Sequence, residues 1–61
     1  MKYSEFHRLA SDEGWVVIRQ SGSHVIYRKN GEICSVPYHG GSEMRKGICL
    51  KLGRKMKLKG F

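Results

Sequence analysis

Three histidines, at positions 7, 24 and 39, are the side chains that can both take and give a proton near neutral pH. His24 follows Gly22-Ser23, where the glycine permits close approach of another backbone, and it begins a stretch of strand-forming residues. His39 follows Pro37-Tyr38, and His7 lies in a helical pattern, where we expect it on the polar side. His24 is the strongest of the three candidates for a catalytic group, although its position alone does not decide the matter.

A histidine beside several arginines, without a metal ion or a cofactor, suits the cleavage of RNA. The 2′-hydroxyl of RNA is a built-in nucleophile toward the adjacent phosphate: a base removes its proton, an acid protonates the leaving 5′-oxygen, and a cation stabilises the phosphorane. Arg19 and Arg28 are the candidate cations. The sequence has no Asp/Glu cluster for two metal ions and no Ser-His-Asp or Cys-His spacing, so we expect no metal site.

Length and charge limit the possibilities. Sixty-one residues form one domain, over 1–61, with room for one small core and no deep cofactor pocket. Twelve Lys and Arg against five Asp and Glu give a net charge of +7, which attracts polyanions. The candidate contacts to an RNA backbone, all near the C-terminus, are Lys46, Arg54 and Lys55.

No apolar run approaches the roughly 18 residues of a membrane helix, and the N-terminus lacks the apolar core of a signal peptide. We therefore expect a cytoplasmic protein without membrane contact. Cys34 and Cys49 fit no metal-ligand spacing and are expected as reduced thiols.

The hydrophobic pattern predicts the order α-β-β-β-α. The first helix covers roughly residues 4–13 with Ser4 as N-cap, strands cover 15–20, 24–29 and 32–36, and the last helix begins between 43 and 47. Asn30-Gly31 predicts a type I′ hairpin turn. We therefore expect an α+β fold, a three-stranded antiparallel sheet with both helices on one face.

Register arithmetic divides the strands into two faces. If Ser21-Gly22 and Asn30-Gly31 are two-residue loops, Arg19 lies opposite His24, because side chains alternate across the pleat. The face expected under the helices holds Val16, Ile18, Val25, Tyr27, Cys34 and Val36. The other face holds Trp15, Val17, Arg19, His24, Ile26, Arg28, Ile33, Ser35 and Pro37, and we expect a protein partner there.

The run from Gly14-Trp15 through Arg19-Gln20 and Ser21-Gly22-Ser23-His24 to Tyr27, with Val36-Pro37-Tyr38-His39, Glu43-Met44 and Gly47 farther on, closely resembles the HicA toxin family. The resemblance covers nearly the whole chain. It implies a fold like the double-stranded-RNA-binding domain, endoribonuclease activity on single-stranded mRNA, and neutralisation by a HicB antitoxin. The catalytic histidine of the family matches His24, and a second histidine matches His39. Gly53 departs from the family, which usually has a large aliphatic residue there.

The resulting hypothesis is a metal-independent mRNA interferase toxin with His24 as general base or acid. Its antitoxin would cover the His24 face, contacting Trp15, Arg19, His24 and Ile26. Two alternatives stay open. One is a module of the same fold that holds structured RNA without cleaving it, and the other is a basic protein whose only ligand is an acidic protein.

Overall fold

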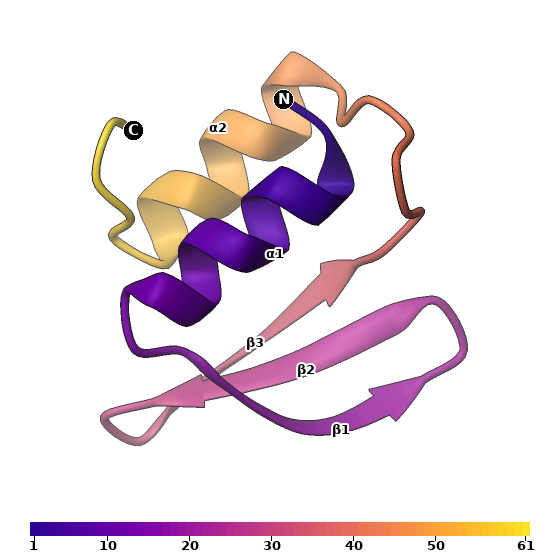
Figure 1. The fold of residues 1–61 in the computed structure, drawn as a ribbon. Coiled ribbons are helices and arrows are strands. Elements are labelled where there is room, and N and C mark those ends of the chain that lie inside the picture. The colour runs from indigo at the N-terminus through magenta and orange to yellow at the C-terminus, as the bar shows by residue number, and fades with distance from the viewer.

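The computed structural model describes residues 1–61 as two helices packed on one face of a three-stranded antiparallel sheet (Figure 1). The elements are α1 (Tyr3–Asp12), β1 (Val16–Ser21), β2 (His24–Lys29), β3 (Glu32–Pro37) and α2 (Lys46–Lys55), and the strands lie in the order β1-β2-β3. The predicted α+β order is confirmed. Each helix has ten residues, and neither is long and apolar enough to cross a membrane.

The two hairpins differ in how well the sequence predicted their register. The second is as expected: Lys29 pairs with Glu32, and Asn30 and Gly31 both have positive φ, at 50° and 81°, as a type I′ turn requires. In the first, Ser21 pairs with His24, so the loop is Gly22-Ser23 rather than Ser21-Gly22. Gly22 has φ 58°, and glycine in the first central position belongs to a type II′ turn.

A register shift in β1 changes which of its side chains share a face. Val17 pairs with Tyr27 and Arg19 pairs with Ile26, which leaves Ile18 as the extra residue of a β-bulge. The predictions that Arg19 faces His24, and that Val16 and Ile18 lie under the helices, are therefore wrong. Val16 is 61% exposed and Ile18 43%.

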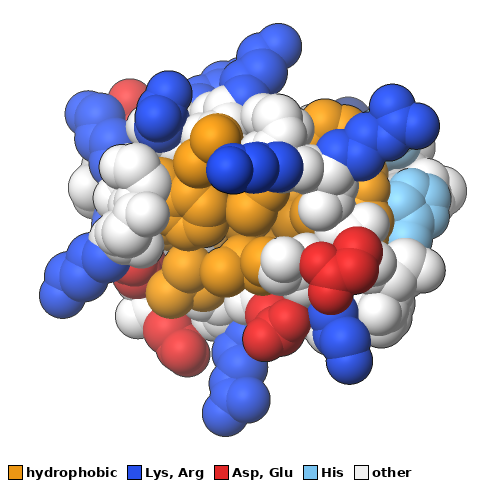
Figure 2. Space-filling view, turned by 90° about the horizontal axis from the view of Figure 1, so that it is seen from above, with side chains coloured by type: hydrophobic (Ala, Val, Ile, Leu, Met, Phe, Trp, Pro, Cys, Tyr) orange, Lys and Arg blue, Asp and Glu red, His pale blue; other side chains and the backbone are white.

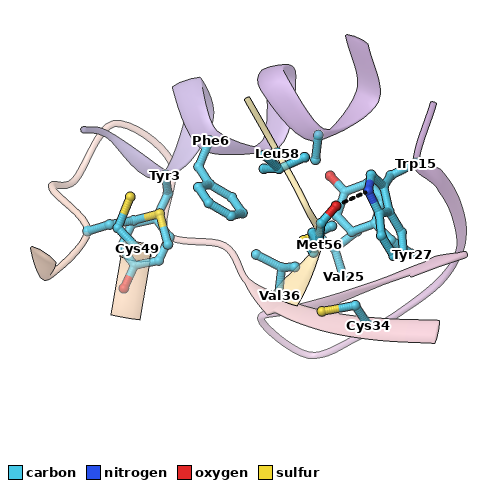
Figure 3. Packing of buried hydrophobic residues seen from close by; sticks show 12 residues of the cluster. Tyr3, Phe6, Trp15, Val25, Tyr27, Cys34, Val36, Cys49, Met56 and Leu58 are labelled. Carbon is cyan, nitrogen blue, oxygen red and sulfur yellow. Dashed lines mark hydrogen bonds between the residues drawn. The ribbon is translucent and has the colours of Figure 1, made fainter. Parts of the chain in front are cut away.

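The remaining predicted inner-face residues are buried as expected: Val25, Tyr27, Cys34 and Val36. They pack against residues of the helices and of the segments beside them, among them Tyr3, Phe6, Ala10, Cys49, Met56 and Leu58 (Figure 3). Both cysteines are free and buried, and burial raises the pKa of the Cys34 thiol.

Trp15 belongs to this core and not to the opposite sheet face, so the prediction that it lies on the His24 face, where it was expected to contact an antitoxin, is wrong. It is 4% exposed, and its indole Nε1–H donates to the Met56 carbonyl at 3.2 Å (Figure 3). The position follows from the turn after α1. Gly14 takes φ 97°, and the Trp15 N–H donates to the Ala10 carbonyl, so the residue lies before the strand and under α2.

His7 is also buried, at 8% exposed, and the prediction that it lies on the polar side of its helix is wrong. Its Nε2 lies 2.8 Å from the Pro37 carbonyl oxygen, and its Nδ1 lies 2.6 Å from the Tyr27 hydroxyl. Because a carbonyl can only accept, Nε2 carries the proton in the neutral ring and Nδ1 accepts from Tyr27. Burial raises the pKa of Tyr27, which keeps that donor protonated. His7 thus joins α1 to β2 and β3.

Replacing His7 with leucine is expected to lower the free energy of unfolding by about 2 kcal/mol, since the buried Tyr27 hydroxyl and the partly buried Pro37 carbonyl lose a hydrogen bond. Urea denaturation measures the change. The matched control is Arg8→Leu, one position away and exposed, which should change stability by less than about 0.5 kcal/mol. A double-mutant cycle with Tyr27→Phe should give a clear coupling energy. A coupling energy of zero would contradict the hydrogen bond.

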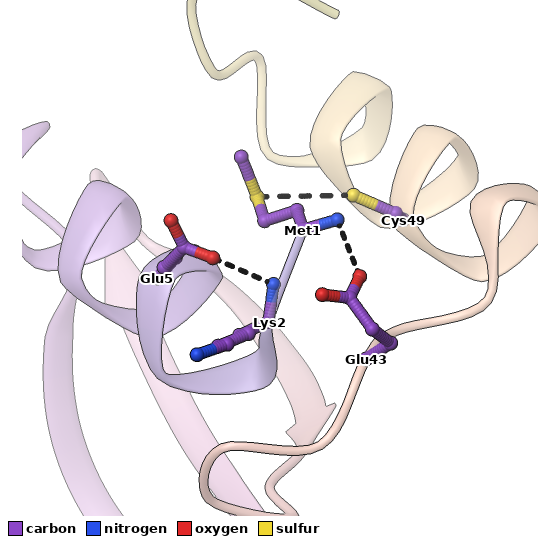
Figure 4. Close-up of polar contacts among 5 residues, drawn as sticks. All are labelled: Met1, Lys2, Glu5, Glu43 and Cys49. Carbon is purple, nitrogen blue, oxygen red and sulfur yellow. Dashed lines mark hydrogen bonds and ion pairs between the residues drawn. The ribbon is translucent and has the colours of Figure 1, made fainter.

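The start of α1 is held by the chain segment between β3 and α2. The predicted N-cap, Ser4, is wrong: Lys2 is the N-cap, and its N–H donates to Glu5 Oε1 at 2.9 Å (Figure 4). The N–H groups of Tyr3 and Ser4 donate to the carbonyls of Ser42 and Gly40. Because the helix N–H groups find backbone acceptors in this segment, no serine cap is needed.

Two further contacts fix the N-terminus in the same place. The Met1 ammonium lies 2.9 Å from Glu43 Oε2, and the Met1 sulfur lies 4.0 Å from Cys49 Sγ (Figure 4). The first pair is exposed and contributes little to stability by itself. Together with the backbone bonds, these contacts join α1, the segment after β3, and α2.

α2 ends in a Schellman motif, in which the residue after the C-cap has a left-handed conformation. Lys57 takes φ 56°, its N–H donates to the Arg54 carbonyl, and the Leu58 N–H donates to the Gly53 carbonyl at 2.9 Å. The chain then folds back so that the Phe61 ring covers Gly53, where a Cβ would overlap the ring.

Replacing Lys57 with glycine should stabilise the protein by about 1 kcal/mol, because glycine takes the left-handed conformation without the Cβ penalty. A thermal melt should show a higher Tm. Lys59→Gly, two residues on and also exposed, serves as the control and should not raise it. A lower Tm for Lys57→Gly would show that the positive φ does not strain this residue.

Candidate functional site

The sheet face opposite the helices carries the candidate site, and we call it the outer face. It is defined by the residues that the observed pairing places there: Val16, Arg19, Ser21, His24, Ile26, Arg28, Ile33, Ser35 and Pro37. Neither helix covers this side of the sheet (Figure 1). It holds two arginines and a histidine and no acidic residue, so its charge suits an anion.

His24 lies at the first position of β2, exposed, between Ser21 on β1 and Pro37 on β3. Its Nδ1 is 3.4 Å from Ser35 Oγ, a long contact, while Nε2 has no partner within the protein. The Tyr38 N–H donates to the Ser23 carbonyl at 2.7 Å, which continues the pairing past Pro37. The ring is therefore oriented from one side and open to a substrate on the other.

The two arginines stand at different distances from His24. Arg19 pairs with Ile26, two residues from His24 on the same face, so it is a diagonal neighbour of the histidine. Arg28 is four residues along β2, about 13 Å away at the rise of a strand. A group bound at His24 would be within the range of Arg19, whereas Arg28 is too far from His24 to contact the same group.

His39 is exposed and lies two residues beyond Pro37, the cross-strand partner of His24. Its ring packs edge-on against Tyr3 with centroids 4.9 Å apart. The contact holds His39 at the end of the sheet that also carries His24.

The predicted backbone contacts on α2 are not brought together with the outer face. Lys46 is the first residue of α2, while Arg54 and Lys55 lie in its last turn, about 12–13 Å away along the helix. All three are exposed, but their helix covers the opposite side of the sheet. Figure 2 looks down on this helix layer and shows Lys and Arg side chains around a central apolar strip.

Ser35, which contacts His24, is the candidate site residue that sequence reasoning did not single out. The register of the second hairpin had already placed it on the His24 face, and that register is correct. The signal available in the sequence was its position two residues before Pro37, the cross-strand partner of His24.

The structure contains two small hollows, of about 160 and 240 Å³, both lined by Trp15 and Glu32 and neither by His24. Nowhere do three His, Cys, Asp or Glu side chains converge as a metal site would require. The outer face is thus an open surface, which fits a polymer rather than an enclosed small molecule.

The fold and the site define a class: a small basic α+β protein with a histidine and arginines on an open sheet face. A family profile described as the HicA toxin of bacterial toxin-antitoxin systems matches residues 3–58. A "Probable mRNA interferase HicA" of Pseudomonas fluorescens (strain Pf0-1) is 36% identical over 59 residues, covering 97% of this chain and 98% of that protein. No solved structure gives a significant match. The chain belongs to the HicA toxin family.

Proposed function

We propose that this protein is a toxin that cleaves mRNA by attack of the ribose 2′-hydroxyl on the adjacent phosphate, without a metal ion. The observation that carries the proposal is His24, which is exposed on an open cationic face with one ring nitrogen free. The family and the name of the relative support RNA cleavage as the activity.

In the proposed reaction, His24 Nε2 takes the 2′-hydroxyl proton or protonates the departing 5′-oxygen. Ser35 Oγ contacts Nδ1 and orients the ring. Arg19 stabilises the charge of the phosphorane, and Arg28 holds the strand farther along. His39, at the same end of the sheet, is the candidate for the second proton-transfer group.

The proposed partner is a HicB-type antitoxin that covers the outer face and blocks the substrate. Ile26 is half-buried between Arg19 and Ser35 and offers it an apolar contact, while acidic groups of the antitoxin meet Arg19 and Arg28. Lys46, Arg54 and Lys55 remain candidate contacts to more distant RNA phosphates.

Incubation of the purified protein with a defined single-stranded RNA in EDTA tests the proposal. Cleavage that persists in EDTA and leaves 2′,3′-cyclic phosphate ends is the expected result, and the rate should fall steeply with added salt. Binding of the RNA without any cleavage would instead favour the non-catalytic module. Products with 5′-phosphate ends would exclude attack by the 2′-hydroxyl.

A further inference from the structure

β1 is the one strand whose side chains the helices leave uncovered. All six of its residues are exposed, whereas β2 and β3 each bury two side chains against the helices. Val17 pairs with the buried Tyr27 and so points to the helix side, yet it is 51% exposed. Val16, Val17 and Ile18 therefore form a run of three exposed β-branched residues on an edge strand.

The backbone N–H and C=O groups on the free edge of β1 also lack hydrogen-bond partners. Ser21 and His24 close a two-residue turn and so form a hydrogen-bonded pair, and such pairs alternate along an antiparallel ladder. The N–H and C=O of Gln20, in the next pair, thus point away from β2. No backbone bond outside the sheet involves any residue of β1. Unpaired edge groups of this kind are a template for another strand.

The opposite edge of the sheet is less suited to strand addition. β3 buries Cys34 and Val36, and it ends at Pro37, which has no N–H to donate. The carbonyl of Pro37 is already used by His7. β1 is accordingly the edge better suited to strand addition.

The charge around β1 decides which kind of strand fits. Two copies of this chain paired antiparallel through β1 would bring their Arg19 side chains close together, and each copy carries a net charge of +7. An acidic strand would instead place carboxylates beside Arg19, with Arg28 one strand farther away on the same outer face.

We propose that β1 is a docking edge to which an acidic segment of the antitoxin adds as a fourth strand. The inference rests on the proposed function and specifies how that partner is held. The added strand satisfies the edge N–H and C=O groups, covers Val16, Val17 and Ile18, and brings the partner next to His24.

Hydrogen exchange in a complex with a HicB-type antitoxin is the direct test. The Gln20 amide should exchange rapidly in the free protein and about 100-fold or more slowly in the complex. A complex in which the Gln20 exchange rate is unchanged overturns strand addition while leaving the toxin–antitoxin pairing intact. A β1–β1 dimer of this chain, or failure to form any complex, overturns it as well.

A pair of variants separates this edge from the rest of the surface. Val17→Asp should weaken antitoxin binding by about 10-fold or more, because it puts a charged side chain in place of an apolar one that the added strand covers. The control, Ile48→Asp on α2, changes another exposed apolar residue and should leave binding unaltered. Free Val17→Asp should still cleave RNA at the wild-type rate; loss of cleavage in the wild-type protein would instead overturn the proposed function. Equal binding by Val17→Asp and the wild type would contradict the docking edge.

Discussion

Replacing His24 with alanine should reduce the rate of RNA cleavage by about 10²–10⁴-fold, the usual contribution of a general acid or base. His24 is exposed, and the only hydrogen bond of its side chain is the 3.4 Å contact with Ser35, so the fold should survive the change. Cleavage of a labelled RNA under single-turnover conditions measures the chemical step. A thermal melt confirms that the variant is folded.

The contrasting variant is Lys46→Ala, which removes an exposed cation from the first turn of α2. If Lys46 contacts a phosphate, affinity for RNA should fall and the salt dependence of binding should become shallower, with the single-turnover rate at saturating protein unchanged. Equal cleavage by His24→Ala and the wild type would exclude His24 as the proton-transfer group.

Replacing Trp15 with alanine should remove most of the stability of the free protein. Truncation of a buried Trp costs about 3–5 kcal/mol, and a core in so short a chain rarely supplies more than that in total. Trp15→Ala should therefore be largely unfolded at 37 °C by circular dichroism. Trp15→Phe keeps an aromatic ring but leaves the Met56 carbonyl without its hydrogen-bond donor. It should lose less stability than Trp15→Ala.

The Trp15 variants also distinguish a core residue from a surface anchor. If Trp15 only contacted an antitoxin, replacing it would weaken antitoxin binding and leave the stability of the free protein unchanged. A wild-type melting curve for Trp15→Ala would contradict the packing described above.

The order of the elements could be predicted from the sequence because it depends on local signals. Asn30-Gly31 specified one hairpin, and β2 and β3 then placed Val25, Tyr27, Cys34 and Val36 on the buried face and His24, Ile26 and Ser35 on the outer face. Each of these face assignments follows from the alternation of side chains along a strand, once the position of the turn is known.

The predictions from sequence are wrong where a long-range contact or a β-bulge overrides the regular alternation of side chains. The β-bulge at Ile18 exchanges the faces of the residues before it, and no single residue type announces it. Trp15 is buried because the chain brings the end of α2 above it, a contact between positions 41 residues apart. His7 looks polar in the sequence and is buried because Tyr27 and Pro37 supply partners for both ring nitrogens.

The Phe61 ring on Gly53 means that two positions of the chain fill a single hole in the helix layer. A leucine at position 53 would occupy from within α2 the volume that the aromatic ring now fills from the segment after it. Positions 53 and 61 therefore share one volume in the core. A larger side chain at position 53 would take the place of the aromatic ring at position 61. Sequences of this fold with an aliphatic residue at 53 can complete the same layer without an aromatic residue at 61.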